Sequence, residues 1–98
     1  MKVEIEDRLF EWDDEKNEIN IRKHGIDFND AIGVFFDEFR IERYDEYHSD
    51  EEDRWKVIGM VDGVLVVIYT EEISSARIIS ARKATKQERR DYYGYSES

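Results

Sequence analysis

The sequence predicts a single α+β domain with two amino-terminal helices, an antiparallel β-sheet meander and a carboxy-terminal helix. Three observations lead to this prediction. Apolar residues recur at helical spacing within residues 28–36. Asp62 and Gly63, the dipeptide that best suits a two-residue hairpin, separate two stretches of β-forming residues. Thr85 and Glu88 have the spacing of a capping box, which marks the start of a helix near the end of the chain.

The first 40 residues are expected to form a short strand and two helices. Residues 8–12 are predicted as the strand. Asp13 or Asp14 then offers a side-chain acceptor for the free amides of a helix over residues 15–24, which Gly25 ends because glycine readily adopts the left-handed conformation. Asp27 is the candidate cap of the second helix, over residues 28–36.

The sheet is expected to contain the remaining strands in sequence order. Each strand is bounded by charged or turn-forming residues, and the ranges are 40–47, 54–61, 64–70 and 77–83. Residues 64–69 are apolar on both faces, as in a central strand, and residues 48–53 form a charged loop. The final helix should run from Thr85 to about Tyr93, with residues 94–98 frayed.

Length and composition indicate one globular domain that spans residues 1–98. The chain has no cysteine and only two histidines, so we expect no disulfide, no metal site and no cofactor. No apolar run approaches the roughly 20 residues that cross a bilayer, and the amino terminus is acidic, which predicts a cytoplasmic protein without a membrane partner.

The charge is unevenly distributed along the chain. The formal net charge of −10 argues against an unaided, non-specific nucleic-acid binder, because phosphate contacts need Lys and Arg. Residues 1–53 carry 7 basic and 19 acidic side chains, whereas residues 54–98 carry 8 and 6. Residues 77–90 contain six basic side chains and one acidic side chain, so a polyanion could bind there.

Several stretches resemble the BrnT toxin family, and together they cover nearly the whole chain. In chain order they are Phe10-Glu-Trp-Asp with Lys16 and Asn20, Lys23-His-Gly, His48-Ser with the acidic run that ends at Arg54-Trp, the apolar strand from Val66 to Thr70, Arg77-Ile-Ile-Ser-Ala-Arg-Lys-Ala-Thr, and Glu88. No single stretch is diagnostic, but their joint order and spacing are hard to obtain by chance. The sequence departs from the family in charge, because such toxins usually carry more Lys and Arg in the closing helix.

The resemblance implies a compact RelE-like fold and a metal-independent ribonuclease that inhibits translation. It also implies a BrnA-like antitoxin with a ribbon-helix-helix region, so that the toxin meets DNA only through the antitoxin. Because ribbon-helix-helix proteins dimerise, we expect a heterotetramer of two toxins and two antitoxins, with an isolated monomer as the alternative.

The first helix carries the candidates for proton transfer. Metal-free RNA cleavage needs a base for the 2′-hydroxyl, cations for the charge on phosphorus and an acid for the leaving oxygen. Lys16, Asn20 and Lys23 recur at helical spacing and share a face, with His24 beside them. His24 is the first candidate for the base or acid and Lys23 a second catalytic candidate, while Lys16 and Asn20 would bind RNA. The alternatives are a helix-ending His24, solvated lysines and an Asn20 bonded to a neighbouring loop.

The predicted strand 77–83 carries the candidates for phosphate binding. Arg77 and Arg82 bracket it, and a guanidinium can hold a phosphate with two hydrogen bonds. Strict alternation places them on opposite faces, so both reach one substrate only if a bulge, a twist or a strand end intervenes. The alternative is that both form structural ion pairs. Further RNA contacts are expected from three nearby cations: Lys83, Lys86 and Arg89.

These residues form one functional hypothesis if His24 and Arg82 meet at a single phosphate-sized hollow. Glu88 is expected to be the capping-box partner of Thr85 and not a catalyst. Two other functions stay open at this point. The acidic composition favours a non-catalytic interaction or co-repressor module, and the acidic residues 50–53 would be needed for a metal-dependent nuclease.

Overall fold

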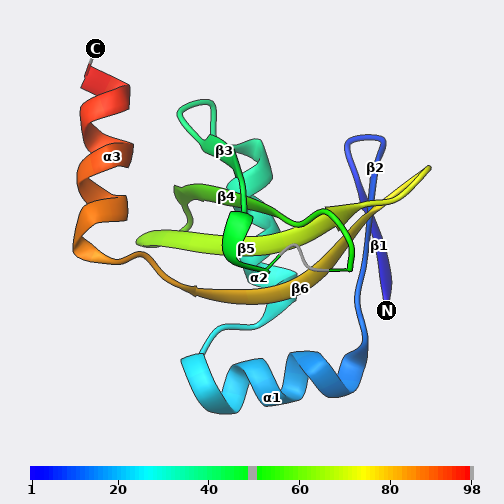
Figure 1. Ribbon diagram of the computed structural model, residues 1–98. Coiled ribbons are helices and arrows are strands. Elements are labelled where there is room, and N and C mark those ends of the chain that lie inside the picture. Colours follow the sequence, from blue (N-terminus) through cyan, green and yellow to red (C-terminus); the bar gives the residue numbers. More distant parts are fainter. Residues whose placement is uncertain (49–50, 98) are drawn as a thin grey trace.

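A computed structural model describes residues 1–48 and 51–97 and contains a six-stranded sheet in the order β1-β2-β6-β5-β4-β3 (Figure 1). The strands are β1 (Lys2–Ile5), β2 (Arg8–Glu11), β3 (Ile41–Tyr44), β4 (Trp55–Met60), β5 (Val64–Glu71) and β6 (Ala76–Lys83). The helices are α1 (Asp14–His24), α2 (Phe28–Ala31) and α3 (Lys86–Glu97), with 3₁₀ turns η1 (Ile32–Phe36) and η2 (Glu46–His48). Part of the expected loop over 48–53, namely Ser49, Asp50 and the side chain of His48, lies outside the description, as does Ser98.

The helix caps confirm the local predictions. Asp13 Oδ1 accepts the amides of Glu15 and Lys16 at 2.9 and 3.1 Å, and Gly25 ends α1 with a φ of 70°. Asp27 caps α2 in the same way. The prediction of one α-helix over residues 28–36 is wrong. Only residues 28–31 are α-helical, and residues 32–36 form the 3₁₀ helix η1. Its apolar face was predicted correctly, since most of its hydrophobic side chains pack into the core.

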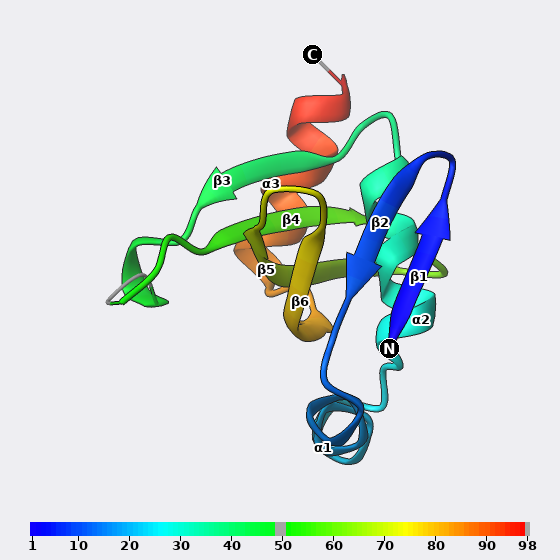
Figure 2. The same ribbon diagram turned by 90° about the vertical axis from the view of Figure 1, so that its right-hand side faces the viewer.

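The meander β3–β4–β5–β6 is antiparallel, as predicted, and Asp62 and Gly63 both have positive φ in the β4–β5 hairpin. The predicted two-residue loop is wrong, because Met60 pairs with Val64 and residues 61–63 form a three-residue loop. The prediction of a wholly antiparallel sheet is wrong. The amino-terminal residues form an additional strand, β1, which pairs with β2, and β2 lies parallel to β6 through Phe10 and Ala76 (Figure 2). Phe10 is fully buried, so its packing fixes β2 against the edge of β6 that the meander leaves open.

A bulge in β6 changes the direction of its side chains. Ile68 pairs with Ser80 whereas Tyr69 pairs with Ile78, so Ile79 is an extra residue on the β6 side. Arg77 lies opposite Thr70 and Arg82 opposite Val66, and these two β5 residues share one face. The bulge therefore places Arg77 and Arg82 on the same face of the sheet, the exception that strict alternation required.

Hydrophobic clusters cover both faces of the sheet. The larger cluster joins α2, η1 and the amino-terminal hairpin to one face, and includes Phe10, Phe28 and Phe35. The smaller cluster lies on the other face, where Tyr92 of α3 packs near Ile58 and Val66. In Figure 1, α1 runs beside β6, and α3 stands on the side of the molecule opposite the β1–β2 hairpin.

The helix α3 begins with the predicted capping box. The Thr85 amide donates to Glu88 Oε1 at 2.8 Å, and the Glu88 amide donates to the Thr85 hydroxyl at 3.1 Å. The helix continues to Glu97, four residues beyond the predicted end. None of the helices in the described ranges is long and apolar enough to cross a lipid bilayer.

Candidate functional site

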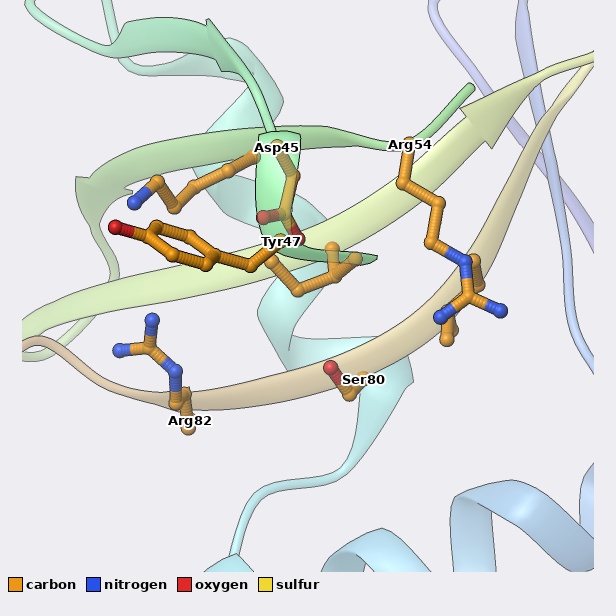
Figure 3. A pocket seen from close by; sticks show the side chains of 8 residues that line it. Asp45, Tyr47, Arg54, Ser80 and Arg82 are labelled. Atoms are coloured by element: carbon orange, nitrogen blue, oxygen red, sulfur yellow. The ribbon is translucent and has the colours of Figure 1, made fainter. Parts of the chain in front are cut away.

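A hollow of about 240 Å³ opens on the sheet face that carries Arg82 (Figure 3). Arg54 and Lys56 reach it from the start of β4, and Arg82 reaches it from β6. Tyr47 in η2 lines it, and Ser80 lies on β6 between Arg54 and Arg82 in the view. We call this space the cationic hollow, because its described lining includes three cations, Arg54, Lys56 and Arg82, against one acidic side chain, the buried Asp45.

Glu88 binds two of these cations. Arg82 holds it with two hydrogen bonds, Nη1 to Oε1 at 2.7 Å and Nη2 to Oε2 at 3.0 Å, and Lys56 Nζ lies 3.4 Å from Oε2. Burial alone would raise the pKa of Glu88, but the Arg82 hydrogen bonds and the Thr85 amide outweigh it and lower the pKa to about 2. The same hydrogen bonds raise the pKa of Arg82. Glu88 is thus both the expected cap and a fixed anion beside the cationic hollow.

Arg82 nevertheless keeps one edge of its guanidinium for a ligand. Nη1 donates to Glu88 and to the Lys83 carbonyl, and one Nη2 hydrogen goes to Glu88. Within the described residues, Nε–H and the second Nη2–H have no protein acceptor. These two donors share an edge of the planar fork, which is the geometry that binds phosphate oxygens in pairs.

Arg77 does not join Arg82 as a clamp. The bulge puts both on one face, but Arg77 Nη2 donates to both carboxylate oxygens of Glu52 at 2.8 Å and its Nε donates to Glu72 at 3.2 Å. The Glu52 hydrogen bonds are the main cause of its raised pKa. Arg77 also does not line the cationic hollow. The expected pair of arginines is therefore replaced by Arg82 with Lys56 and Arg54, of which Arg54 Nη2 lies 3.8 Å from Glu52.

A second hollow, of about 190 Å³, lies between α1 and β6. The α1 side chains predicted to share a face do so, since Lys16, Asn20, Lys23 and His24 all line it. Its β6 side is formed by Ile79 and Ser80, which also line the cationic hollow. The expectation of one hollow for His24 and Arg82 is wrong: they line two spaces that adjoin at the bulged residues.

Asn20 is held in the interior of the fold. Its side chain is 5% exposed, and its amide bonds both backbone groups of Ala81, at 2.9 and 3.1 Å, and the Ile26 carbonyl at 2.9 Å. The partner strand β2 pairs only with the beginning of β6, so Asn20 supplies the hydrogen bonds that a neighbouring strand would make at Ala81. Its amide joins α1 to β6, so Asn20 holds the fold together and is not one of the proposed RNA-binding residues.

The other predicted cations are dispersed. Lys83 pairs with Leu65 on the opposite face from Arg82 and lines a different hollow beside Gly25. Lys86 and Arg89 lie exposed on α3 and line neither hollow described above. Sequence proximity grouped these side chains, but strand alternation and the start of α3 separate them.

The predicted site residues did not include Lys56, Tyr47 or Asp45, which line the cationic hollow. Lys56 lies on the same strand face as Arg54 and opposite Ile68, so the period-two pattern of residues 54–60 contained a signal for it. Tyr47 follows a charged segment with no periodic signal. No three His, Cys, Asp or Glu side chains converge as metal ligands within residues 1–48 and 51–97.

Comparison with known proteins gives the family. Residues 12–88 match the family model described as "Ribonuclease toxin, BrnT, of type II toxin-antitoxin system", which spans most of the chain and both hollows. The chain belongs to the BrnT family. The crystal structure of the Brucella abortus ribonuclease toxin BrnT, at 1.1 Å resolution, is similar with a TM-score of 0.58 and 29% identity, and covers 76% of this chain and 94% of that one. None of the curated protein sequences compared with this BrnT-family chain matches it.

Membership identifies the chain as a ribonuclease toxin of a type II toxin-antitoxin system, and such a system implies an antitoxin partner. The family match ends at residue 88, so it includes the capping box but not most of α3. Every lining residue of the cationic hollow and of the second hollow lies within the matched range.

Proposed function

We propose that this BrnT-family chain is an endoribonuclease that cuts RNA at the cationic hollow without a metal ion and so inhibits translation. The observation that carries the proposal is the convergence of Arg54, Lys56 and Arg82, with the free guanidinium edge of Arg82 available in the same space. Three cations around one hollow suit a phosphate that gains negative charge during cleavage. RelE-like classification of the fold, which the sequence resemblance implies, stays a prediction.

Cleavage needs one proton removed and one supplied. A base takes the proton of the ribose 2′-hydroxyl, the oxygen attacks the adjacent phosphorus, and the 5′-oxygen leaves with a proton from an acid, giving a 2′,3′-cyclic phosphate and a free 5′-hydroxyl. His24 is our candidate for one of these transfers. It lines the second hollow with Lys16 and Lys23, next to Ser80, so an RNA strand that crosses Ser80 would touch both hollows.

The antitoxin partner is proposed to be BrnA-like, with a ribbon-helix-helix region that alone contacts DNA. Because that region is dimeric, we expect a complex of two toxins and two antitoxins. The complex is proposed to be cytoplasmic. Size-exclusion chromatography with light scattering on the co-expressed pair tests the stoichiometry. A ribbon-helix-helix reading frame beside the gene for this chain is the expected source of the partner.

The nuclease assay uses antitoxin-free protein, RNA and EDTA. We expect cleavage to persist in EDTA and kcat/KM to fall about 100-fold or more in Arg82→Ala, because a preorganised cation is lost from the transition state. Lys56→Ala should also lower kcat/KM, but by a smaller factor. This variant keeps Arg82, which holds Glu88 with two hydrogen bonds. His24→Ala should lower kcat more than it raises KM.

Lys83→Ala is the matched control, because Lys83 is an exposed cation next in sequence to Arg82 and on the opposite face of the sheet. It should keep wild-type activity. Cleavage that stops in EDTA and returns with Mg²⁺ would overturn the metal-independent mechanism. Equal losses in Lys83→Ala and Arg82→Ala would mean that general charge, not the cationic hollow, determines activity.

A non-catalytic interaction or co-repressor module is the second candidate function. It is favoured by the net charge of −10 and by the carboxylates that pair with Arg77, Arg82 and Lys56. These pairs weaken the attraction of the surface for polyanions. A folded wild-type preparation that binds its antitoxin but does not cleave RNA would support this second function.

A further inference from the structure

Tyr47 is the one tyrosine whose described side chain has no partner in the described part of the protein. It belongs to η2 (Glu46–His48), and 90% of it is exposed to solvent. Tyr44 packs edge-to-face on Trp55, and the rings of Tyr69 and Tyr92 contact other aromatic rings, but none of the described residues bonds to Tyr47 or packs a ring against it. The ring therefore contributes little to the fold, because an aromatic side chain stabilises a protein through the area that it buries.

The position of this ring is what gives it a function. Tyr47 lines the cationic hollow together with Arg54, Lys56 and Arg82. Figure 3 shows the ring extending from η2 over the hollow toward the side where Arg82 lies, with Arg54 at the other end. An exposed aromatic face beside a cluster of cations is the combination that binds single-stranded nucleic acid, in which cations hold the phosphates and rings hold the bases.

We propose that Tyr47 stacks on an unpaired base of the RNA whose phosphate occupies the cationic hollow, so that the toxin selects single-stranded RNA. The inference rests on the proposed function and names the substrate class for the same site. A base in an A-form duplex has both faces covered by its neighbours, whereas a splayed base offers a face to an aromatic ring. Because every base has such a face, Tyr47 favours single strands without reading their sequence.

Binding of an uncleavable probe tests the proposal apart from catalysis. The probe is a fluorescently labelled 2′-O-methyl oligoribonucleotide, and its affinity for antitoxin-free protein is measured at fixed low salt. Tyr47→Leu should weaken binding about 5- to 140-fold, the range that loss of one stacked base produces. Tyr47→Phe keeps the ring and should stay within about twofold of the wild type. Ile73→Ala removes another exposed apolar side chain, one that does not line the cationic hollow, and should change nothing.

Two further ligands separate stacking from other roles of the ring. A ribose-phosphate chain of the same length without bases should bind wild type and Tyr47→Leu equally, because only phosphate contacts remain. The probe annealed to its complement should bind the wild type more weakly than the single strand does. In the cleavage assay, Tyr47→Leu should raise KM with a smaller effect on kcat, since Tyr47 positions the substrate and does not touch the reacting atoms.

Contrary results are equally specific. Unchanged affinity of Tyr47→Leu for the probe, or an equal loss for the chain without bases, overturns the stacking role while cleavage by the wild type leaves the proposed function intact. Loss of antitoxin binding with unchanged RNA binding would assign Tyr47 to the protein partner instead. A wild type that neither binds nor cuts RNA overturns both proposals.

Discussion

Replacing Asn20 by alanine is expected to destabilise the fold by about 3 kcal/mol. The substitution removes three buried hydrogen bonds, two to the backbone of Ala81 and one to the Ile26 carbonyl. Each such bond contributes about 1 kcal/mol net. Alanine is too short to replace these bonds, so the amide and carbonyl of Ala81 would stay buried without partners.

Urea unfolding followed by circular dichroism measures the effect. With an m-value of about 1 to 1.5 kcal/mol/M for a domain of this size, the midpoint should fall by about 2 to 3 M. Glu18→Ala is the control on the same helix, because Glu18 is exposed, and it should change stability by less than about 0.5 kcal/mol. If Asn20→Ala unfolds within about 1 kcal/mol of the wild type but binds RNA poorly, then the structural assignment of Asn20 is refuted and the RNA-binding prediction is restored.

Three further predictions concern α3 and two glycines. The Glu88 pKa of about 2, below its ordinary 4.5, stabilises the fold above pH 4.5 and loses this effect as the pH falls toward 2, so the acid loss of at most about 3 kcal/mol should shrink in Glu88→Gln, as measured by unfolding from pH 6 to 2. Tyr92→Phe removes a hydrogen bond to a carboxylate and should lower the free energy of unfolding by about 1.5 to 3 kcal/mol in the same measurement, whereas no change would show that the bond does not hold α3. Gly59→Ala should cost about 1 to 3 kcal/mol, because its Cβ would lie 2.9 Å from Val34 Cβ, while Gly94→Ala meets nothing within 4 Å and should raise the melting temperature; the reverse order would contradict the packing of η1 on β4.

The elements that sequence reasoning predicted correctly depend on residues close together in the chain. Asp13 caps a helix whose amides lie two and three positions later, and Thr85 and Glu88 satisfy each other across one turn. Asp62 and Gly63 specify where the chain turns, because both take positive φ, but they did not fix the loop length, which is three residues and not two. The stripe of α1 side chains in the second hollow follows from helical spacing alone.

The candidate site could be predicted only in part. Arg82 and His24 were predicted from the chemistry of their side chains. The sequence did not show that Glu88, six positions after Arg82, binds its guanidinium, because the capping box already explained Glu88. Lys56 could have been predicted from strand alternation, because it is a lone cation on a strand that pairs with the apolar strand β5. Tyr47 could not, since exposure and position beside a hollow are properties of the folded chain.

By itself, the sequence determined the caps, the position of the central hairpin, the order of the helices and the meander, and the family. Tertiary structure alone decided the parallel contact of β2 with β6, the bulge at Ile79 and the bonds from Asn20 to Ala81. The physical reason is the range of the interactions. Caps and turns are fixed by a few consecutive residues, whereas the Asn20–Ala81 contact joins positions 61 apart, and its existence depends on how the whole core packs α1 against the open edge of the sheet.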